Sequence, residues 1–322
     1  MRLVSFSPKG AGPTALGLLE DGAVLELNRA AALLDVPDAG PALLSTMESL
    51  LADWEHGSAV ARETAARAAS STSKARERLA AARHPLESVR LRPPVRRPAA
   101  IRDFYSFETH VRNARARRGL AVPPEWYEFP VFYFSNPGAL VGHGEPVAKP
   151  AWTDALDYEL EIACVIGKEA RDVRAEDWRS VVAGFTILND WSARDVQRRE
   201  MAVGLGPAKG KDFATSLGPA LVTQEELEPR RRGDRHDLTM EARVNGRTLS
   251  KANAQDMHYT FAQMIARASQ DVYLFPGDVI GSGTAGGGCL LELGPEVHRW
   301  LQSGDEVTLE IELLGALTNR IV

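Results

Sequence analysis

The sequence is poor in cysteine: its 322 residues include only Cys164 and Cys289, each within an apolar run. Two thiols cannot supply a disulfide framework for a chain of this length, so we expect both to be buried and reduced. Long apolar runs are also missing. The first residues lack the apolar core and cleavage site of a signal peptide, and the longest uncharged stretch, residues 129–144, is broken by prolines and too short for a membrane span. These absences predict a cytoplasmic protein with no membrane partner.

The chain also has no excess of positive charge. It contains 38 Lys and Arg residues against 43 Asp and Glu residues, a formal net charge of −5. This balance excludes the overall basicity expected of a nucleic-acid-binding protein. The surplus of carboxylates points elsewhere, because hard divalent cations bind carboxylate oxygens in proteins.

A proline-rich linker divides the chain. Residues 92–98 contain three prolines, through which no helix can continue. We therefore predict a small N-terminal α+β domain over residues 1–98, with helices at 41–54 and 58–83, and a larger domain over residues 99–322. In the larger part strands outnumber helices and are not regularly interleaved with them. The predicted fold class is α+β with mixed sheets.

Two glutamates share the strand predicted over residues 157–166. Glu159 and Glu161 would project from the same face, about 6.5 Å apart, and the strand continues into the apolar run around Cys164. Side-by-side carboxylates on a half-buried face repel each other, and a divalent cation with oxygen ligands would compensate for the repulsion. An exposed edge strand with an ordinary acidic face explains the same pattern without a metal.

Further polar residues follow apolar segments. Asp190 lies two positions after the apolar residues 184–188, where a strand opens into a helix. Asp190 or Ser192 could instead cap that helix. Asp103 ends a short apolar segment after the linker. His110 follows it on a predicted helix, where a lone histidine is more often a packing or solvated residue.

The glycine-rich residues 281–288 suggest a phosphate-binding loop, but the context argues against one. The segment lacks the Gly-Lys-Ser/Thr ending of a P-loop, and we predict that residues 289–293 behind it form a strand rather than a helix. The remaining hypothesis is that the backbone of this segment closely approaches a ligand, with Thr284 and Glu292 flanking the ligand.

In combination these motifs resemble those of the fumarylacetoacetate hydrolase family, from about Asp103 to the C-terminus. They follow the order and approximate spacing of that family. The segments that carry the resemblance are Asp103-Phe104-Tyr105 with His110, Tyr158-Glu159-Leu160-Glu161, the run from Asn189-Asp190-Trp191 to Gln197, Gly210-Lys211-Asp212-Phe213, Pro276-Gly277-Asp278, Gly281-Ser282-Gly283-Thr284 and Leu291-Glu292-Leu293.

The resemblance implies a set of site residues and a rolled mixed β fold, usually in a homodimer. It implies that Asp103, Glu159, Glu161 and Asp190 are the metal ligands; an all-carboxylate set suits Mg²⁺, Ca²⁺ or Mn²⁺ rather than zinc. It implies that His110 is the general base, oriented by Glu292. It implies that Arg194, Gln197 and Lys211 are catalytic residues around the reacting carbonyl. It also implies that Tyr105, Tyr133 and Thr284 bind the substrate. The family's lid arginine has no clear counterpart among Arg112, Arg115, Arg117 and Arg118, of which we choose Arg118.

For activity the resemblance implies metal-dependent hydrolysis of a carbon–carbon bond in a 1,3-dicarbonyl acid of the fumarylacetoacetate or acylpyruvate type, as in aromatic catabolism. The alternative is an isomerase or decarboxylase that acts on a 2-oxo or 2-hydroxy-dienoic acid, or on oxaloacetate, through a metal enolate. The expected water-activating pair, His110 with Glu292, favours hydrolysis. A module that binds a metal or ligand without catalysis is a third hypothesis, which the presence of both His110 and Lys211 disfavours.

Overall fold

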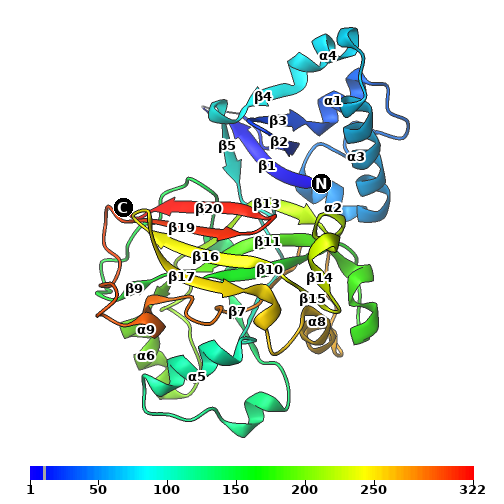
Figure 1. Cartoon of the computed structure of the whole chain (residues 1–322). Coiled ribbons are helices and arrows are strands. Elements are labelled where there is room, and N and C mark those ends of the chain that lie inside the picture. Colours follow the sequence, from blue (N-terminus) through cyan, green and yellow to red (C-terminus); the bar gives the residue numbers. More distant parts are fainter. Residues whose placement is uncertain (10–11) are drawn as a thin grey trace.

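The computed structural model describes residues 1–9 and 12–322. Its N-terminal part begins with three antiparallel strands, which are followed by helices and two short returning strands (Figure 1). The elements of this part are β1 (Arg2–Pro8), β2 (Ala15–Glu20), β3 (Ala23–Glu26), α1 (Leu27–Leu33), α2 (Met47–Ala52), α3 (Trp54–Ala69), α4 (Ser73–Leu79), β4 (Arg83–Pro85) and β5 (Val89–Arg92).

Helix α3 shows why this part folds as it does. Its buried residues include Val60, Ala61, Thr64 and Ala68, which repeat at the spacing of one helical face. The single helix predicted over residues 58–83 is wrong, because α3 ends at Ala69 and α4 begins only at Ser73. The hydroxyl of Thr72 caps α4, and a side chain that satisfies free N–H groups in this way marks the start of a new helix.

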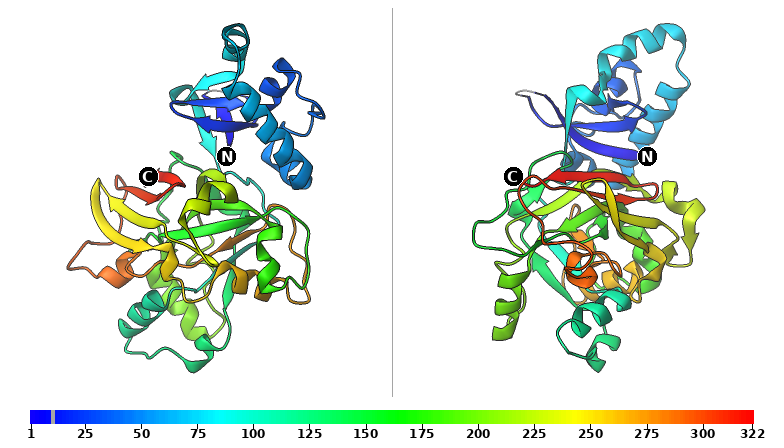
Figure 2. Two further views of the ribbon diagram at one scale, coloured as in Figure 1. Left: turned by 45° about the vertical axis from the view of Figure 1, so that its right-hand side comes forward. Right: turned by 60° about the vertical axis from the view of Figure 1, so that its left-hand side comes forward.

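The remaining chain is rich in strands, and short helices lie mostly at its periphery (Figures 1 and 2). Its strands are β6 (Ile101–Phe104), β7 (Phe132–Ser135), β8 (Leu140–Val141), β9 (Leu156–Asp157), β10 (Glu161–Ile166), β11 (Val182–Asp190), β12 (Ser192–Ala193), β13 (Thr215–Thr223), β14 (Arg231–Arg232), β15 (Arg235–His236), β16 (Thr239–Val244), β17 (Arg247–Asn253), β18 (Val279–Gly281), β19 (Glu306–Ile311) and β20 (Gly315–Arg320). Its α-helices are α5 (Glu108–Ala116), α6 (Arg194–Val203), α7 (Gln224–Leu227), α8 (Phe261–Ser269) and α9 (Leu290–Leu293).

Over the described residues the largest sheet has 12 strands, with the main order β4-β3-β2-β1-β13-β11-β10-β18-β6-β7. Most of its pairs are antiparallel, but β6 pairs with β18 and β8 with β13 in parallel. Strand β1 pairs with β13, so the N-terminal strands extend the sheet of the larger part. This mixture of sheet and helix confirms the predicted α+β class.

A second sheet, with the order β17-β16-β19-β20, lies beside the first (Figure 1). Asn245 and Gly246 join β16 to β17, and both have positive φ angles, 51° and 77°, as a type I′ hairpin turn requires. Buried side chains of this sheet, including Met240, Leu309 and Leu317, belong to the same hydrophobic cluster as Phe185 and Ile187 of β11. The site described below therefore rests on a rigid support of two packed sheets.

Two local predictions fail in this part. The strand predicted over residues 157–166 is interrupted, since β9 ends at Asp157 and β10 begins at Glu161. Between them, the N–H of Glu159 donates to the Asn189 side chain and the N–H of Leu160 to the Gly288 carbonyl, rather than to a strand ladder. Residues 290–293 form helix α9, not a strand, because the Asp157 carboxylate accepts hydrogen bonds from its first N–H groups.

No helix in the described ranges, 1–9 and 12–322, combines the length and the apolar character that crossing a membrane requires.

Candidate active site

A cavity of about 460 Å³ opens where β6, β10, α5, α6 and the glycine-rich loop meet. It brings together side chains that lie up to 197 positions apart in the sequence, from Asp103 to Trp300. Of the predicted site residues, those that line it are Asp103, Tyr105, His110, Arg118, Tyr133, Glu159, Glu161, Arg194, Gln197, Lys211 and Thr284. Asp190 and Glu292 lie behind this wall and contact Lys211 and His110, respectively.

The register of the sheet explains how two of the acidic residues meet. Asp103 on β6 pairs with Gly281 on β18, and Gly281 pairs with Ala163 on β10, two residues after Glu161. The missing side chain of Gly281 leaves the space that both carboxylates use: a Cβ there would lie 2.5 Å from Asp103 Oδ1 and 3.3 Å from Glu161 Oε2. Oxygen atoms of Asp103, Glu159 and Glu161 all lie within 4.8 Å of one another.

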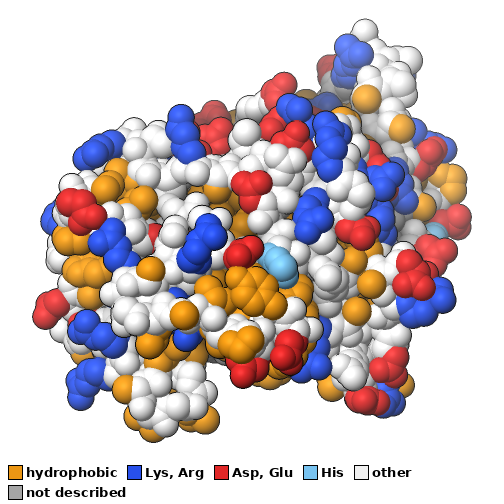
Figure 3. Space-filling view, turned by 60° about the horizontal axis from the view of Figure 1, so that its bottom comes forward, with side chains coloured by type: hydrophobic (Ala, Val, Ile, Leu, Met, Phe, Trp, Pro, Cys, Tyr) orange, Lys and Arg blue, Asp and Glu red, His pale blue; other side chains and the backbone are white. Residues whose placement is uncertain are grey.

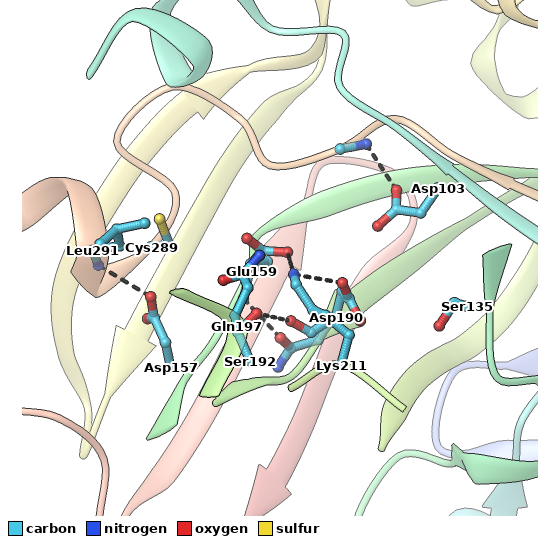
Figure 4. A network of polar contacts seen from close by, with 12 residues as sticks. Asp103, Ser135, Asp157, Glu159, Asp190, Ser192, Gln197, Lys211, Cys289 and Leu291 are labelled. Atoms are coloured by element: carbon cyan, nitrogen blue, oxygen red, sulfur yellow. Dashed lines mark hydrogen bonds and ion pairs between the residues drawn. The ribbon is translucent and has the colours of Figure 1, made fainter. Parts of the chain in front are cut away.

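Glu159 reaches this cluster from irregular backbone, not from the shared strand face that its spacing predicts. Its carboxylate accepts a hydrogen bond from Arg194 Nη2 at 2.8 Å and a short ion-pair contact from Lys211 Nζ (Figure 4). Lys211 also contacts Asp190 Oδ2 at 2.6 Å. Glu159 and Glu161 therefore lie close together, as their spacing predicts. However, Glu159 is held in place by Arg194 and Lys211 rather than by the geometry of a strand.

Asp190 is the last residue of β11 and is fully buried. The alternative that it caps helix α6 is wrong, because the residue before α6 is Ala193 and no side chain caps that end. Asp190 Oδ2 instead accepts hydrogen bonds from Lys211 and from the hydroxyl of Tyr133, which also lies 3.4 Å from Asp103 Oδ2. Tyr133 thus touches the carboxylates as well as lining the cavity.

The charges in this cluster do not balance. Glu159 and Asp190 pair with Lys211 or Arg194, whereas Asp103 and Glu161 have no cationic partner among the described residues. Burial, reinforced by the neighbouring carboxylates, raises the pKa of Asp103 to about 7 and raises the pKa of Glu161 well above its usual range. Burial opposes ionisation of Glu159 too, but Lys211 and Arg194 outweigh it and lower its pKa. Asp103 and Glu161 would therefore need a further cation to be ionised together.

The donor set fits a hard divalent cation. Both carboxylate oxygens of Glu161 and Oδ1 of Asp190 are buried and make no hydrogen bond within the described part of the chain. Such orphaned acceptors are costly unless a cation or proton meets them. Oxygen-only ligands favour Mg²⁺, Mn²⁺ or Ca²⁺, and a doubly charged ion would neutralise the surplus of Asp103 and Glu161.

A histidine–carboxylate pair lies beside the cluster. His110 of α5 places Nδ1 2.5 Å from Oε1 of Glu292 on α9. Glu292 Oε2 also accepts hydrogen bonds from the Asn113 side chain at 3.0 Å and the Gly287 N–H at 2.9 Å. These bonds outweigh burial and lower the pKa of Glu292. The carboxylate thus fixes one imidazole nitrogen and leaves Nε2 free to act on a molecule in the cavity.

The structure adds two residues that sequence reasoning missed. Asn113 lies one helical turn after His110 on α5, and this i to i+3 spacing is a signal that could have drawn attention to it. Asp157 is fully buried and contacts Arg194 and helix α9. In the sequence, Asp157 lies just before the acidic pair Glu159 and Glu161, and that position suggests only a third carboxylate.

Arginines occupy the outer rim of the cavity. Arg115, Arg117, Arg118 and Arg198 line it, from α5, the residues after α5, and α6. Arg117 is tied to Glu296 and to the Glu292 carbonyl, whereas Arg115, Arg118 and Arg198 have no carboxylate partner in the described ranges. The space-filling view from below shows basic side chains spread between hydrophobic ones on this side of the molecule (Figure 3).

Comparison with known proteins places this fold and site in one family. The family model described as "Fumarylacetoacetate (FAA) hydrolase C-terminal" matches residues 99–322, and the chain belongs to the fumarylacetoacetate hydrolase family. The family includes enzymes, as the following relatives show.

Several relatives are named as oxaloacetate tautomerases, of which two are described here, and one similar solved structure is that of a hydrolase. The chain is 33% identical over 328 residues to "Oxaloacetate tautomerase Fahd2a, mitochondrial" of Rattus norvegicus, covering 100% of this chain and 92% of that protein. It is 31% identical over 250 residues to "Oxaloacetate tautomerase YisK" of Bacillus subtilis (strain 168), covering 77% and 78%. The structure of maleylpyruvate hydrolase from Sphingobium sp. SYK-6, in complex with manganese(II) ion and pyruvate, matches with a TM-score of 0.69 at 25% identity, covering 100% and 99%.

Proposed function

We propose that this protein is a divalent-metal-dependent enzyme that interconverts the keto and enol forms of a short 2-oxo dicarboxylic acid of the oxaloacetate type. The single observation that carries the proposal is His110, which lines the cavity beside three carboxylates and is held through Nδ1 by Glu292. The two tautomerases that match most or all of the chain support this substrate class. Hydrolysis, which the sequence alone favoured, becomes the second candidate.

The residues that would hold the metal are Asp103, Glu159 and Glu161, with Asp190 behind them. When bound, a divalent ion would polarise the substrate carbonyl as a Lewis acid and so acidify the neighbouring C–H group. Mn²⁺ in the hydrolase structure supports an ion of this type. The assay described below compares Mn²⁺ with Mg²⁺.

Proton transfer falls to His110. Its neutral Nε2 takes a proton from the carbon between the two carbonyl groups, the C–H electron pair becomes the carbon–carbon double bond, and the carbonyl π electrons move to oxygen. The imidazolium then returns the proton to that oxygen. Glu292 fixes the tautomer and stabilises the imidazolium in between, as expected for a general base with an orienting carboxylate.

Cationic side chains bind the charged substrate. Lys211 and Arg194, together with Gln197, lie where they would donate to the developing oxyanion, and a well-placed donor of this kind contributes about 3–4 kcal/mol. The pKa of Lys211 is raised, because Asp190 and Glu159 outweigh the effect of burial, so it stays a cation. The guanidinium of Arg118, which has no carboxylate partner in the described ranges, would bind the second carboxylate of the substrate together with Arg115 and Arg198. Tyr105, Tyr133 and Thr284 complete the wall.

A specific observation keeps hydrolysis as the second candidate. The same Nε2 of His110 could take its proton from water, so that hydroxide adds to the carbonyl of an acylpyruvate. The carbon–carbon bond would then break, its electron pair leaving with the enolate of pyruvate, and the imidazolium would return the proton to that enolate. The maleylpyruvate hydrolase match supports this reaction class. The two candidates share one site and differ in whether the base meets a C–H group or a water molecule.

A paired assay separates the two candidates. Oxaloacetate tautomerisation, oxaloacetate decarboxylation and acylpyruvate hydrolysis are measured with Mn²⁺, with Mg²⁺ and after chelation. We expect tautomerisation to dominate, to require the metal, and to fall by about 10²–10⁴-fold in His110→Ala, the range for loss of a positioned general base.

Mn²⁺ affinity should survive in His110→Ala, because no ligand is lost, and His56→Ala, on the exposed face of α3, is the matched control. Fast acylpyruvate hydrolysis with slow tautomerisation would select the second candidate. Full activity after exhaustive chelation would contradict both.

A further inference from the structure

The buried carboxylate of Asp157 lies between the two halves of the site. Asp157 ends the short strand β9 and is fully buried, and it does not line the cavity. It therefore has no direct route to a substrate. Figure 4 shows it between Leu291 of helix α9 and the group around Glu159 and Gln197.

One half that Asp157 holds is helix α9, which carries Glu292. Asp157 Oδ1 accepts a hydrogen bond from the Leu290 N–H at 2.8 Å, and Oδ2 accepts one from the Leu291 N–H at 3.0 Å. These are the first two residues of α9, and Cys289 before them offers no side-chain cap. A helix of four residues has little stability of its own, so a carboxylate from elsewhere in the chain decides where it lies.

The other half is Arg194. The same Oδ2 of Asp157 accepts a hydrogen bond from Arg194 Nε at 2.8 Å. The remaining nitrogens of Arg194 donate to Glu159 at 2.8 Å and to Gln197 at 3.0 Å. Asp157 thus fixes the position of the Arg194 guanidinium, which in turn holds the carboxylate of Glu159.

We propose that Asp157 is a positioning residue whose single carboxylate fixes both the Glu292–His110 pair and the Arg194–Glu159 pair. It thereby sets the distance between the half of the site that transfers protons and the half that binds charge. The kinetic test of this inference rests on the proposed function, whereas the structural test, which observes the His110–Glu292 hydrogen bond, does not. The residue acts through Arg194 and α9 and touches no substrate.

The chemistry of the contacts makes an aspartate necessary. Three donors converge on its two oxygens, and a carboxylate accepts all of them because it has about four lone-pair sites. An asparagine has one oxygen, and its NH₂ group would face an N–H or a guanidinium. Arg194 would also lose a buried counter-ion, which is costly within a low-dielectric environment. Both α9 and Arg194 are then expected to shift.

The test compares Asp157→Asn with Asp278→Asn. Asp278 is a close structural match: it is buried, and it accepts hydrogen bonds from Arg102 at 3.1 Å and from the N–H groups of Ala100 at 3.0 Å and Phe275 at 3.2 Å. It contacts neither Glu292 nor Arg194 among the described residues. A loss that follows only from breaking a buried aspartate–arginine pair should therefore appear in both variants.

Two readouts distinguish positioning from general stability. In Asp157→Asn we expect kcat on oxaloacetate to fall by about 10²-fold with KM changed by less than about threefold, as for a small misplacement of catalytic groups. We also expect the far-downfield proton resonance of the His110 Nδ1–Glu292 hydrogen bond, observed without substrate, to be lost or strongly shifted. Asp278→Asn should keep both the resonance and kcat.

The outcomes are distinct. An unchanged resonance with near-normal kcat in folded Asp157→Asn overturns the proposal. A wild-type enzyme without activity on any assayed substrate contradicts the proposed function alone, because the resonance still tests Asp157. If Asp157→Asn does not fold, Asp157→Ser is used, since a serine hydroxyl caps a helix without needing more space. If neither folds while Asp278→Asn does, Asp157 is a structural residue and the positioning role is wrong.

Discussion

At the scale of single residues, charge pairing explains the arrangement of the site. Asp157, Glu159 and Asp190 each contact Lys211 or Arg194, whereas Asp103 and Glu161 have no cationic partner in the described ranges. A buried carboxylate without a partner normally protonates. Asp103 and Glu161 are therefore a pair of carboxyl groups with raised pKa values, next to carboxylates that each contact a cation.

The first prediction concerns Gly281, which leaves room for those two carboxylates. In Gly281→Ala, the new Cβ would lie 2.5 Å from Asp103 Oδ1, so the carboxylates must separate. We expect Mn²⁺ affinity, measured by titration calorimetry, to fall by at least about tenfold, the order seen when the support of a metal ligand is disturbed.

Gly40→Ala is the matched control, because nothing lies within 4 Å of a Cβ built there. If Gly281→Ala binds Mn²⁺ as tightly as the wild type does, Asp103 and Glu161 do not bind the ion together beside Gly281.

The second prediction concerns pH and a histidine remote from the site. His236 is buried against Phe185, with ring centroids 5.0 Å apart, and burial followed by the charge of Arg179 lowers its pKa to about 4. Because the unfolded chain binds this proton near pH 6.5 and the folded chain only near pH 4, stability contributed by His236 is lost as pH falls between these values. The expected loss is on the order of 2 kcal/mol.

Denaturant unfolding at several pH values checks this. In His236→Phe the decline in unfolding free energy between pH 6.5 and pH 4 should become shallower than in the wild type. His56→Gln, at an exposed position of α3, should leave the slope unchanged. The same slope in wild type and His236→Phe would show that other groups cause the decline.

At the scale of elements, α9 begins at bonds from a distant carboxylate, whereas α8 has its own start signal. The hydroxyl of Thr260 accepts a hydrogen bond from the Gln263 N–H, and the Gln263 side chain accepts one from the Thr260 N–H at 2.9 Å. This capping box begins a helix whose face, including Phe261 and Ile265, packs into the main core.

We expect Thr260→Ala to lower the free energy of unfolding by about 1 kcal/mol, because it removes a buried cap. Thr72, the exposed cap of α4, lacks the reciprocal bond, so Thr72→Ala should cost less. Chemical denaturation of the two variants beside the wild type measures the difference. An equal or larger loss in Thr72→Ala would contradict the role given to the capping box.

At the scale of the whole molecule, the N-terminal part and the larger part share a sheet and a core. Residues from both sides of residue 98, among them Leu3, Leu16, Leu217 and Leu221, belong to one buried hydrophobic cluster. The predicted division into domains 1–98 and 99–322 stays a prediction, as does the homodimer, which light scattering on the purified protein would test.

We expect residues 99–322 expressed alone to have a lower melting temperature than the full chain. Removing β1 would expose the edge of β13 and the apolar side chains that face it, and unpaired edges and apolar patches favour aggregation. Calorimetry and light scattering on both proteins check this. A fragment that melts like the full chain and stays dispersed would show that the larger part folds independently.

The sequence by itself determined the family, the fold class and the residue types of the site. Motifs such as Tyr158-Glu159-Leu160-Glu161 and the hairpin at Asn245-Gly246 are local, and local spacing with turn chemistry suffices to read them. The family assignment is confirmed by the match over residues 99–322. The roles of the individual site residues stay predictions that the geometry supports.

Only the tertiary structure decided how these residues meet. It showed that Glu159 lies outside the strand and that residues 290–293 form a helix. It also showed that Asn113 donates to Glu292 and that Asp157 accepts a hydrogen bond from the start of α9. The physical reason is that these features depend on pairing between distant segments: the carboxylate of Asp157 caps a helix 133 positions away, and it neutralises an arginine 37 positions away. Local sequence patterns do not specify which buried charges become partners, because burial and register are properties of the assembled sheets.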